Sequence, residues 1–267
     1  MLFLFAFSCL PEKKILTLHT IMTISVITCT YNAATVLTAT LDSVRQQAHA
    51  DVEHIIVDGA SADDTMSVVE QYQQAEQHHR VVVVSEKDNG LYDAMNKGIR
   101  LATGRYLVFL NAGDKFYSYD TLAQVSAKAE GKDYGVIYGD TEIVDDNGHS
   151  IGMRRLRPPE KLTWQSFSNG MLVCHQAFYA NTAVAKRVEY DTRYRLSADV
   201  DWCIRVMKTA EAEGLENLNT HLTLCRYLEG GMSVKNHRAS LIERFHIMRI
   251  HYGLFKTIYK HITFFFR

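Results

Sequence analysis

Acidic and amide side chains follow four successive apolar segments of this chain, at the point where each segment ends. These residues are Asn32 after the first segment, Asp58 after the second, Glu86 and Asp88 after the third, and Asn111 and Asp114 after the fourth. Carboxylates gathered in one place repel one another unless positive charge lies among them, and a divalent cation with oxygen ligands would supply that charge. Lys97 and Arg100 would add fixed positive charge for an anion such as a diphosphate. The pattern predicts a site that binds a divalent cation together with an anionic ligand.

The elements that position these residues follow from the hydrophobic pattern. It predicts strands over 24–29, 52–57, 81–84 and 106–110, and helices over 35–47, 63–74 and 91–102. This alternation of strand and helix predicts an α/β fold, in which helices flank a mostly parallel sheet. Because the carboxyl ends of parallel strands meet at one edge, the polar residues named above would share one site.

The pattern is looser in the second half of the chain. It predicts a helix over 122–129, a strand over 135–138, a hairpin over 143–149, a strand over 171–179 and a helix over 199–212. We expect this half to add a small antiparallel edge to the sheet. No linker divides the chain into independent domains.

Glycine-rich phosphate loops are missing from the sequence. The first strand leads into Thr30, Tyr31 and Asn32, with neither the Gly-x-Gly-x-x-Gly nor the Gly-Lys-Ser/Thr pattern. This argues against a dinucleotide-dependent dehydrogenase and a P-loop NTPase. Any nucleotide would be held by metal and side chains instead of a glycine turn at a helix N-terminus.

The composition excludes other classes of function. The chain has 267 residues, with 29 Lys and Arg against 30 Asp and Glu, so no basic field favours nucleic acid. The five Cys are scattered and odd in number, which favours a reduced, cytoplasmic setting. Residues 1–21 begin with an apolar run too short to span a bilayer, and we interpret them as a disordered leader or a mis-assigned start.

Several segments together resemble the family 2 glycosyltransferases with the GT-A fold, most closely those of colanic-acid-type exopolysaccharide clusters. The matching segments are 26–32 (VITCTYN), 56–63 (IVDGASAD), 85–90 (SEKDNG), 92–98 (YDAMNKG), 104–114 (GRYLVFLNAGD), 197–201 (SADVD) and 230–233 (GGMS). The resemblance implies a Rossmann-like central sheet in one domain over 22–235. Residues 22–115 would form its nucleotide-sugar half and residues 116–235 its acceptor half.

The resemblance also implies roles for individual residues. The donor-binding residues would be Thr30, Tyr31, Asp58, Glu86, Asp88, Asp93, Asn96, Lys97 and Asn111. Asp114 matches the last acid of the Asp-x-Asp-type metal motif, but Asn111 stands where its first acid is usual. The Mg²⁺ or Mn²⁺ ion would therefore rest on Asp114 and the donor diphosphate alone.

The implied reaction is inverting transfer of one sugar from a nucleotide-diphosphate sugar, with UDP favoured. Asp199 matches the catalytic base, and Asp201 is its rival, about 200° away around the predicted helix. His175 either contacts the acceptor or packs in the core.

Processivity is not expected because the Gln-x-x-Arg-Trp signature is absent. The alternatives are a nucleotidyltransferase, for which the Gly-rich, Arg-bearing loop is missing, and a non-catalytic sugar-nucleotide binder.

The C-terminal tail, residues 236–267, is basic and rich in aromatic residues. Between residues 235 and 267 the chain has seven Lys and Arg and a single acid, Glu243. We expect a helical tail that contacts an anionic membrane surface; the alternative is a helix packed on the domain. Membrane contact would suit a saccharide acceptor linked to lipid, in cell-surface polysaccharide biosynthesis at the inner face of the cytoplasmic membrane.

Overall fold

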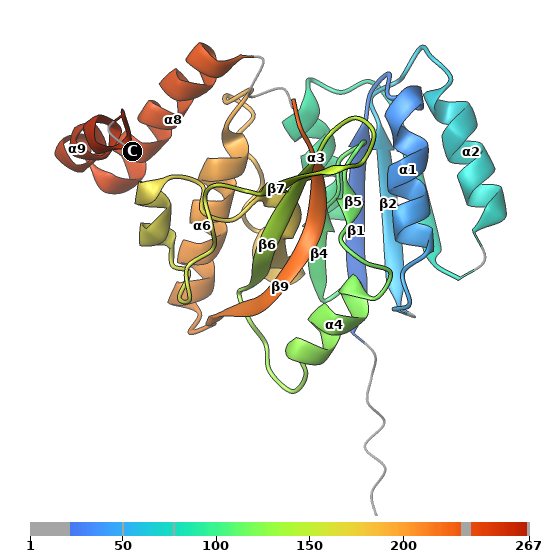
Figure 1. The fold of residues 1–267 in the computed structure, drawn as a ribbon, viewed down its shortest axis with the longest axis horizontal. Helices are drawn as coiled ribbons and strands as arrows, with labels where there is room; N and C mark the ends of the chain where they lie inside the picture. Colours follow the sequence, from blue (N-terminus) through green and yellow to red (C-terminus); the bar gives the residue numbers. More distant parts are fainter. Residues whose placement is uncertain (1–21, 50, 77, 231–235, 266–267) are drawn as a thin grey trace, which may run out of the picture.

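Four parallel strands form the first half of a mixed sheet. The computed structural model describes residues 22–49, 51–76, 78–230 and 236–265, so the predicted leader lies outside the described residues. The strands are β1 (Ile24–Thr30), β2 (Val52–Asp58), β3 (Arg80–Ser85) and β4 (Tyr106–Phe109), in the order β3-β2-β1-β4. Every residue of β1 and β2 is buried, which is typical of parallel strands covered on both faces (Figure 1).

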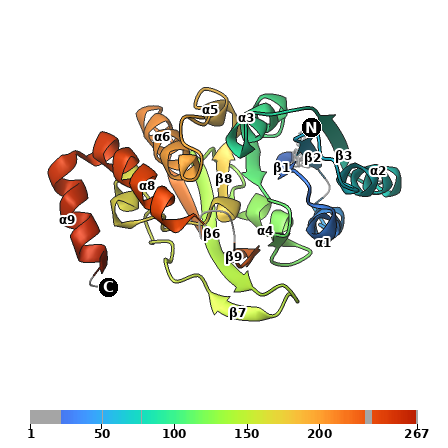
Figure 2. The same cartoon turned by 90° about the horizontal axis from the view of Figure 1, so that it is seen from above.

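Three helices connect these strands and cover the sheet. They are α1 (Ala34–Arg45), α2 (Thr65–Ala75) and α3 (Leu91–Leu101). Figure 2 shows α1 and α2 on one face of the sheet and α3 on the other. α3 approaches β1 closely because Gly98 has no side chain; a β-carbon there would collide with Ile27. These seven elements agree with the sequence prediction to within two residues at each end.

The second half of the chain extends the sheet with antiparallel pairs. Its elements are β5 (Lys115–Phe116), α4 (Thr121–Lys128), β6 (Val136–Val144), β7 (Ser150–Met153), η1 (Trp164–Asn169), η2 (His175–Ala177), β8 (Phe178–Asn181), α5 (Thr182–Ala185), α6 (Ala198–Ala212) and β9 (Asn217–Leu228). Beyond β4 the order is β8-β6-β9-β5, and β7 pairs with β6. β8 is antiparallel to β4 and β6, whereas β6 and β9 are parallel. The predicted antiparallel edge is therefore present.

Two predictions for this half need correction. The strand expected over 171–179 is wrong for most of its length, because residues 175–177 form the short helix η2 and β8 begins only at Phe178. The apolar residues before η2 are buried in the core without joining the sheet. The long strand β9 was not predicted, although its alternation of apolar and polar residues carried the signal.

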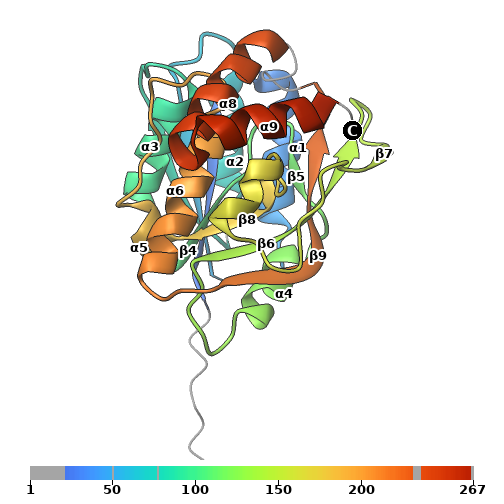
Figure 3. The ribbon, with the colours of Figure 1, turned by 90° about the vertical axis from the view of Figure 1, so that its left-hand side faces the viewer.

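The tail consists of two helices, in agreement with the helical tail predicted from the sequence. α8 (His237–Tyr252) ends at Gly253, whose φ of 81° is a left-handed conformation suited to glycine, and α9 (Leu254–Phe265) follows. α8 packs against α6 and η1, and α9 packs against α8 and η1 (Figure 3). Of the helices that the structure describes, none is both long enough and apolar enough to cross a membrane.

Candidate active site

The carboxyl ends of the parallel strands lie together at one edge of the sheet. Thr30 of β1 pairs with Asp58 of β2, and Asp58 pairs with Ser85 of β3. β4 ends beside β1, where the Leu110 N–H donates a hydrogen bond to the Ile27 carbonyl at 2.9 Å. The parallel register therefore brings the residues after these strands to a common edge.

Asp58 is completely buried at this edge and shapes the loop that follows β2. Its Oδ2 accepts hydrogen bonds from the Ser61 N–H at 3.0 Å and from the Ser85 hydroxyl at 2.7 Å. The carboxylate thus ties the end of β2 to the end of β3. Its predicted place near a nucleoside base stays a prediction.

Tyr31, Gly59 and Asp88 form a small surface over this edge. The Tyr31 side chain is 65% exposed, so its ring is available to a ligand. A β-carbon on Gly59 would lie 2.6 Å from Asp88 Oδ2 and 3.3 Å from Tyr31 Cδ2, and only glycine leaves this space open. A flat aromatic ring beside a carboxylate is suited to stacking and hydrogen bonding with a planar base.

Two buried polar atoms at the same edge lack a protein partner. Within the described part of the chain, the Thr30 hydroxyl oxygen and the Asn111 amide oxygen are buried without a hydrogen bond. One follows β1 and the other follows β4, which are neighbouring strands. Buried polar atoms are nearly always paired, so unpaired atoms at a strand edge indicate groups available to a ligand.

Some polar residues of α3 contact the loop before this helix, whereas another is buried against the segment before α6. Lys97 forms an ion pair with Glu86 at 2.9 Å, and Asp93 accepts a hydrogen bond from the Asn89 N–H at 2.9 Å. Asn96 is instead buried, and its amide exchanges two hydrogen bonds with the Tyr190 backbone, at 3.0 and 2.7 Å. Asn96 therefore fixes the segment before α6, and its predicted contact with the donor stays a prediction.

A hydroxyl of α1 fixes the loop after β4. The Thr40 hydroxyl donates to the Asp114 carbonyl at 2.8 Å and accepts from the Gly113 N–H at 2.9 Å. Gly113 has a φ of 100°, which strongly favours glycine. These bonds turn the chain so that the Asp114 side chain enters the interior and does not continue along the edge.

Both carboxylate oxygens of Asp114 are committed to protein donors. Oδ1 accepts from the Leu228 N–H at 2.9 Å and Oδ2 accepts from the Gln176 amide at 2.7 Å. Burial raises the pKa of Asp114 to about 8. Among the described residues no group of three or more His, Cys, Asp or Glu side chains could hold a metal ion. In this arrangement the residues around Asp114 do not fit a resident cation, because both of its oxygens are bonded to the protein. The role of Asp114 as a metal ligand stays a prediction from the sequence.

Asp199 lies in the first turn of α6 and is half-buried. Its Oδ1 accepts a hydrogen bond from the Tyr92 hydroxyl of α3 at 3.4 Å and from the Val200 N–H at 3.0 Å. A carboxylate at this position interacts favourably with the positive end of the helix dipole. A partly exposed carboxylate at a helix N-terminus, oriented by a tyrosine, has the features of a proton acceptor.

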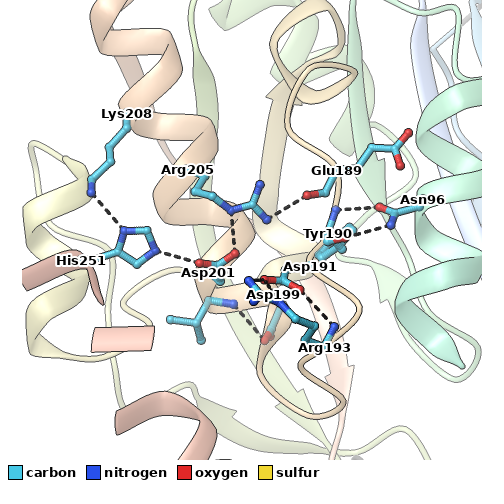
Figure 4. A network of polar contacts seen from close by, with 11 residues as sticks. Asn96, Glu189, Tyr190, Asp191, Arg193, Asp199, Asp201, Arg205, Lys208 and His251 are labelled. Atoms are coloured by element: carbon cyan, nitrogen blue, oxygen red, sulfur yellow. Dashed lines mark hydrogen bonds and ion pairs between the residues drawn. The ribbon is translucent and has the colours of Figure 1, made fainter. Parts of the chain in front are cut away.

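Asp201 belongs to a buried network on the other side of α6. Its Oδ1 contacts His251 Nε2 at 2.8 Å and its Oδ2 accepts from Arg205 Nε at 2.6 Å, while His251 Nδ1 contacts Lys208 Nζ at 3.0 Å (Figure 4). Burial alone would raise the pKa of Asp201, but these hydrogen bonds and the Arg205 charge hold it below its usual value. The network favours Asp199 over its rival as the base.

His175 is part of the aromatic core. Its ring stacks on Phe109, with 4.8 Å between ring centroids, and its Nε2 bonds to the Tyr190 hydroxyl. Burial lowers the pKa of His175 to about 4, so the imidazole is neutral. His175 thus packs in the core, with 5% of the residue exposed, and its contact with the acceptor stays a prediction.

Comparisons with known proteins identify the family of this chain. The sequence model described as Glycosyl transferase family 2 matches residues 25–186, more than half of the chain. The chain belongs to glycosyl transferase family 2. It is 35% identical over 215 residues to a PGL/p-HBAD biosynthesis glycosyltransferase of Mycobacterium bovis, an alignment that covers 78% of each protein. The chain is thus a glycosyltransferase related to a biosynthetic enzyme.

Solved structures share the fold of this glycosyltransferase. The structure of Staphylococcus aureus TarS 1–349 in complex with UDP-GlcNAc matches with a TM-score of 0.67 and 18% identity, covering 86% of this chain and 65% of that one. The mannosyltransferase PcManGT of Pyrobaculum calidifontis, in complex with GDP-Man and Mn²⁺, matches with a TM-score of 0.64 and 17% identity, covering 90% and 70%. At these identities the likeness shows the GT-A fold alone.

Four residues that contact the candidate site or the helix α6 were missed by the sequence analysis. Thr40 and Gln176 hold the loop after β4, and Tyr92 contacts Asp199. Glu243 of α8 binds backbone N–H groups before α6. All four come from elements far away in the sequence from the groups they contact, so spacing along the chain carries no signal for them.

Proposed function

We propose that this enzyme transfers a single sugar, with inversion, from a UDP-sugar or related nucleotide-diphosphate sugar to a lipid-linked saccharide. The acceptor would belong to cell-surface polysaccharide biosynthesis at the inner face of the cytoplasmic membrane. The observation that carries the proposal is the half-buried Asp199 at the N-terminus of α6, oriented by Tyr92. The family and the UDP-GlcNAc bound by TarS support a nucleotide-sugar donor.

The donor would lie along the carboxyl edge of the sheet. Tyr31 offers an exposed ring for the base, and Asp88 lies beside it across Gly59. The unpaired oxygens of Thr30 and Asn111, within the described residues, would bond to polar groups of the donor. This arrangement requires neither a glycine-rich loop nor a helix N-terminus for the diphosphate.

Asp199 would act as the general base. It takes the proton of the acceptor hydroxyl as that oxygen bonds to the anomeric carbon, and the bond from this carbon to the diphosphate oxygen breaks with its electron pair. Attack from the face opposite the leaving group inverts the anomeric centre. The Tyr92 hydroxyl would orient the carboxylate.

Dependence on Mg²⁺ or Mn²⁺ forms a separate part of the proposal. Mn²⁺ is present in the PcManGT complex, and a cation could stabilise the charge on a diphosphate leaving group. No step above is routed through a cation, since Asp114 is committed to Leu228 and Gln176. Donor turnover measured with EDTA and with Mn²⁺ tests this part.

The decisive experiment separates donor binding from turnover. Thermal shifts with UDP, GDP and dTDP identify the nucleotide, since a ligand that binds only the folded state stabilises it. Asp199→Asn is expected to keep the nucleotide-induced shift and to lose about 100-fold or more of the donor turnover. Asp146→Asn, an exposed carboxylate in the turn after β6, is the matched control.

Two results would contradict the proposal. Near-normal turnover of folded Asp199→Asn would remove Asp199 from the mechanism. Absence of turnover by the wild type with every nucleotide sugar that shifts its melting temperature would favour the non-catalytic binder.

A further inference from the structure

Helix α9 presents an apolar face to solvent. Its exposed residues are Leu254 (46% exposed), Phe255 (89%), Ile258 (41%), Tyr259 (63%) and Ile262 (54%). At about 100° of rotation per residue, all of them fall within one arc of about 140° around the helix. The apolar side chains of α9 therefore form a continuous exposed stripe, which we call the α9 face.

The polar side of α9 is the side that touches the protein. Thr257 is fully buried, and Lys260 Nζ donates to Asn169 Oδ1 of η1 at 2.6 Å. A helix on the surface of a globular domain normally turns its apolar side inward. The orientation of α9 is the reverse, so burial among the described residues does not explain the apolar residues that are exposed on this helix.

The α9 face is held in a defined position. His251 at the end of α8 binds Asp201 of α6 at 2.8 Å (Figure 4), and the Tyr252 ring stacks on Trp164 of η1 with 5.8 Å between centroids. Lys260 adds its contact with Asn169 on the same short helix. These contacts fix the end of α8 and the middle of α9 against the domain. The apolar stripe is therefore a feature of the folded protein.

The charged side chains of α9 and of the last turn of α8 are Lys and Arg. Lys256 in α9 and Arg249 at the end of α8 are exposed, and the sequence contains no Asp or Glu after Glu243. Glu243 itself is occupied by the backbone N–H groups of residues 195–197. An apolar stripe on a helix whose charged side chains are Lys256 and Lys260 complements a bilayer that contains anionic lipid, whereas a second copy would bring the same positive charges against it.

We infer that the α9 face is a membrane-docking surface, which lies in the interfacial layer of an anionic bilayer with Phe255, Tyr259 and Ile262 among the acyl chains. This inference rests on the proposed function in one respect, that the acceptor is linked to lipid. Docking through α9 would hold the domain at the surface where such an acceptor is found.

Vesicle binding by the full chain tests the inference. We expect the wild type to sediment with vesicles of phosphatidylcholine and phosphatidylglycerol, and at least about tenfold more weakly with vesicles of phosphatidylcholine alone. The triple variant Phe255→Ser, Tyr259→Ser, Ile262→Ser should lose at least about tenfold of the binding to anionic vesicles. Ile151→Ser, an apolar residue of β7 with 53% exposure, is the matched control.

The assay contains no sugar donor, so its failure is distinct from failure of the proposed reaction. The triple variant should keep the wild-type nucleotide-induced thermal shift, which shows that it is folded, and Asp199→Asn should still bind vesicles. Equal binding by the triple variant and the wild type would overturn the inference. So would self-association of the wild type without vesicles that the triple variant abolishes, because the occupant would then be a second copy.

Discussion

The carboxylate of Glu243 in α8 accepts a hydrogen bond from the backbone N–H of Ser197, immediately before α6, at 2.9 Å. The same carboxylate accepts from the N–H groups of Arg195 and Leu196, each also at 2.9 Å. A carboxylate at a helix N-terminus satisfies free N–H groups and interacts favourably with the helix dipole. Because Asp199 lies in the first turn of α6, the tail fixes the start of the helix that carries the proposed base.

Glu243→Ala is therefore expected to lower the free energy of unfolding by about 2–4 kcal/mol, since these N–H groups lose a charged acceptor. Donor turnover should fall more than nucleotide affinity. Glu243→Gln keeps one carbonyl oxygen and should be intermediate in both. Urea denaturation and turnover measurements check this, with Glu211→Ala, an exposed acid of α6, as control. Unchanged stability of Glu243→Ala would show that the bonds contribute nothing.

The bonds of Asp114 predict a coupling with Gln176. Asp114→Ala leaves the Leu228 N–H and the Gln176 amide without their acceptor, at a cost of about 1–3 kcal/mol each. The double variant with Gln176→Ala should be less destabilised than the sum of the single variants, by about 0.5–3 kcal/mol. Urea denaturation of the four proteins gives this coupling energy, and exact additivity would contradict it.

The same carboxylate gives a prediction about metal. Because its oxygens are already bonded, Asp114→Asn should keep any additional thermal shift that Mn²⁺ produces in the presence of UDP. Loss of that shift, with the UDP shift retained, would instead identify Asp114 as a metal ligand. Asp146→Asn serves as the control for removing a carboxylate elsewhere.

The parallel half of the fold was predictable because the residues of each strand and helix carry a recognisable hydrophobic pattern of their own. β1 and β2 are rich in Val and Ile, and the helices of this half, such as α1 and α3, carry apolar residues at helical spacing. The second half depends on distant partners. Residues 171–174 are as apolar as a strand, yet the chain turns at His175 so that Gln176 reaches Asp114.

The location of the candidate site at one edge of the sheet was predictable from the sequence. Which of its side chains point into the protein and which point to solvent was not. The register of parallel strands brings Thr30 and Asp58 together, as expected. Whether a carboxylate or amide faces solvent depends on donors elsewhere in the chain: Ser85 turns Asp58 inward, and the Tyr190 backbone does the same to Asn96. Likewise, the basic tail was evident from the sequence, but the outward face of α9 depends on how α8 docks.

His175 gives the folded protein a sensitivity to acid. Burial lowers its pKa from 6.5 to about 4, so in this pH range the unfolded chain binds a proton that the folded protein does not. Stability should therefore decrease as the pH falls from about 6.5 to about 4, by about 3 kcal/mol from this residue. His175→Gln should flatten this part of the profile, measured by urea denaturation, whereas exposed His246→Gln should not. If the pH dependence of the free energy of unfolding were the same in His175→Gln and the wild type, His175 would not be the source of the acid sensitivity.

Substitutions of the two carboxylates of α6, Asp199 and Asp201, should have different effects: one on turnover and the other on stability. Asp201→Asn weakens the bonds to His251 and Arg205, so we expect a loss of about 1–3 kcal/mol in the free energy of unfolding, with turnover of the folded protein within about tenfold of the wild type. Asp199→Asn should show the opposite, with nearly unchanged stability and about 100-fold or greater loss of turnover. Both are measured below the melting temperature of the less stable variant. If Asp201→Asn lost turnover while Asp199→Asn kept it, the base would be Asp201, and His251 would be the group that orients it.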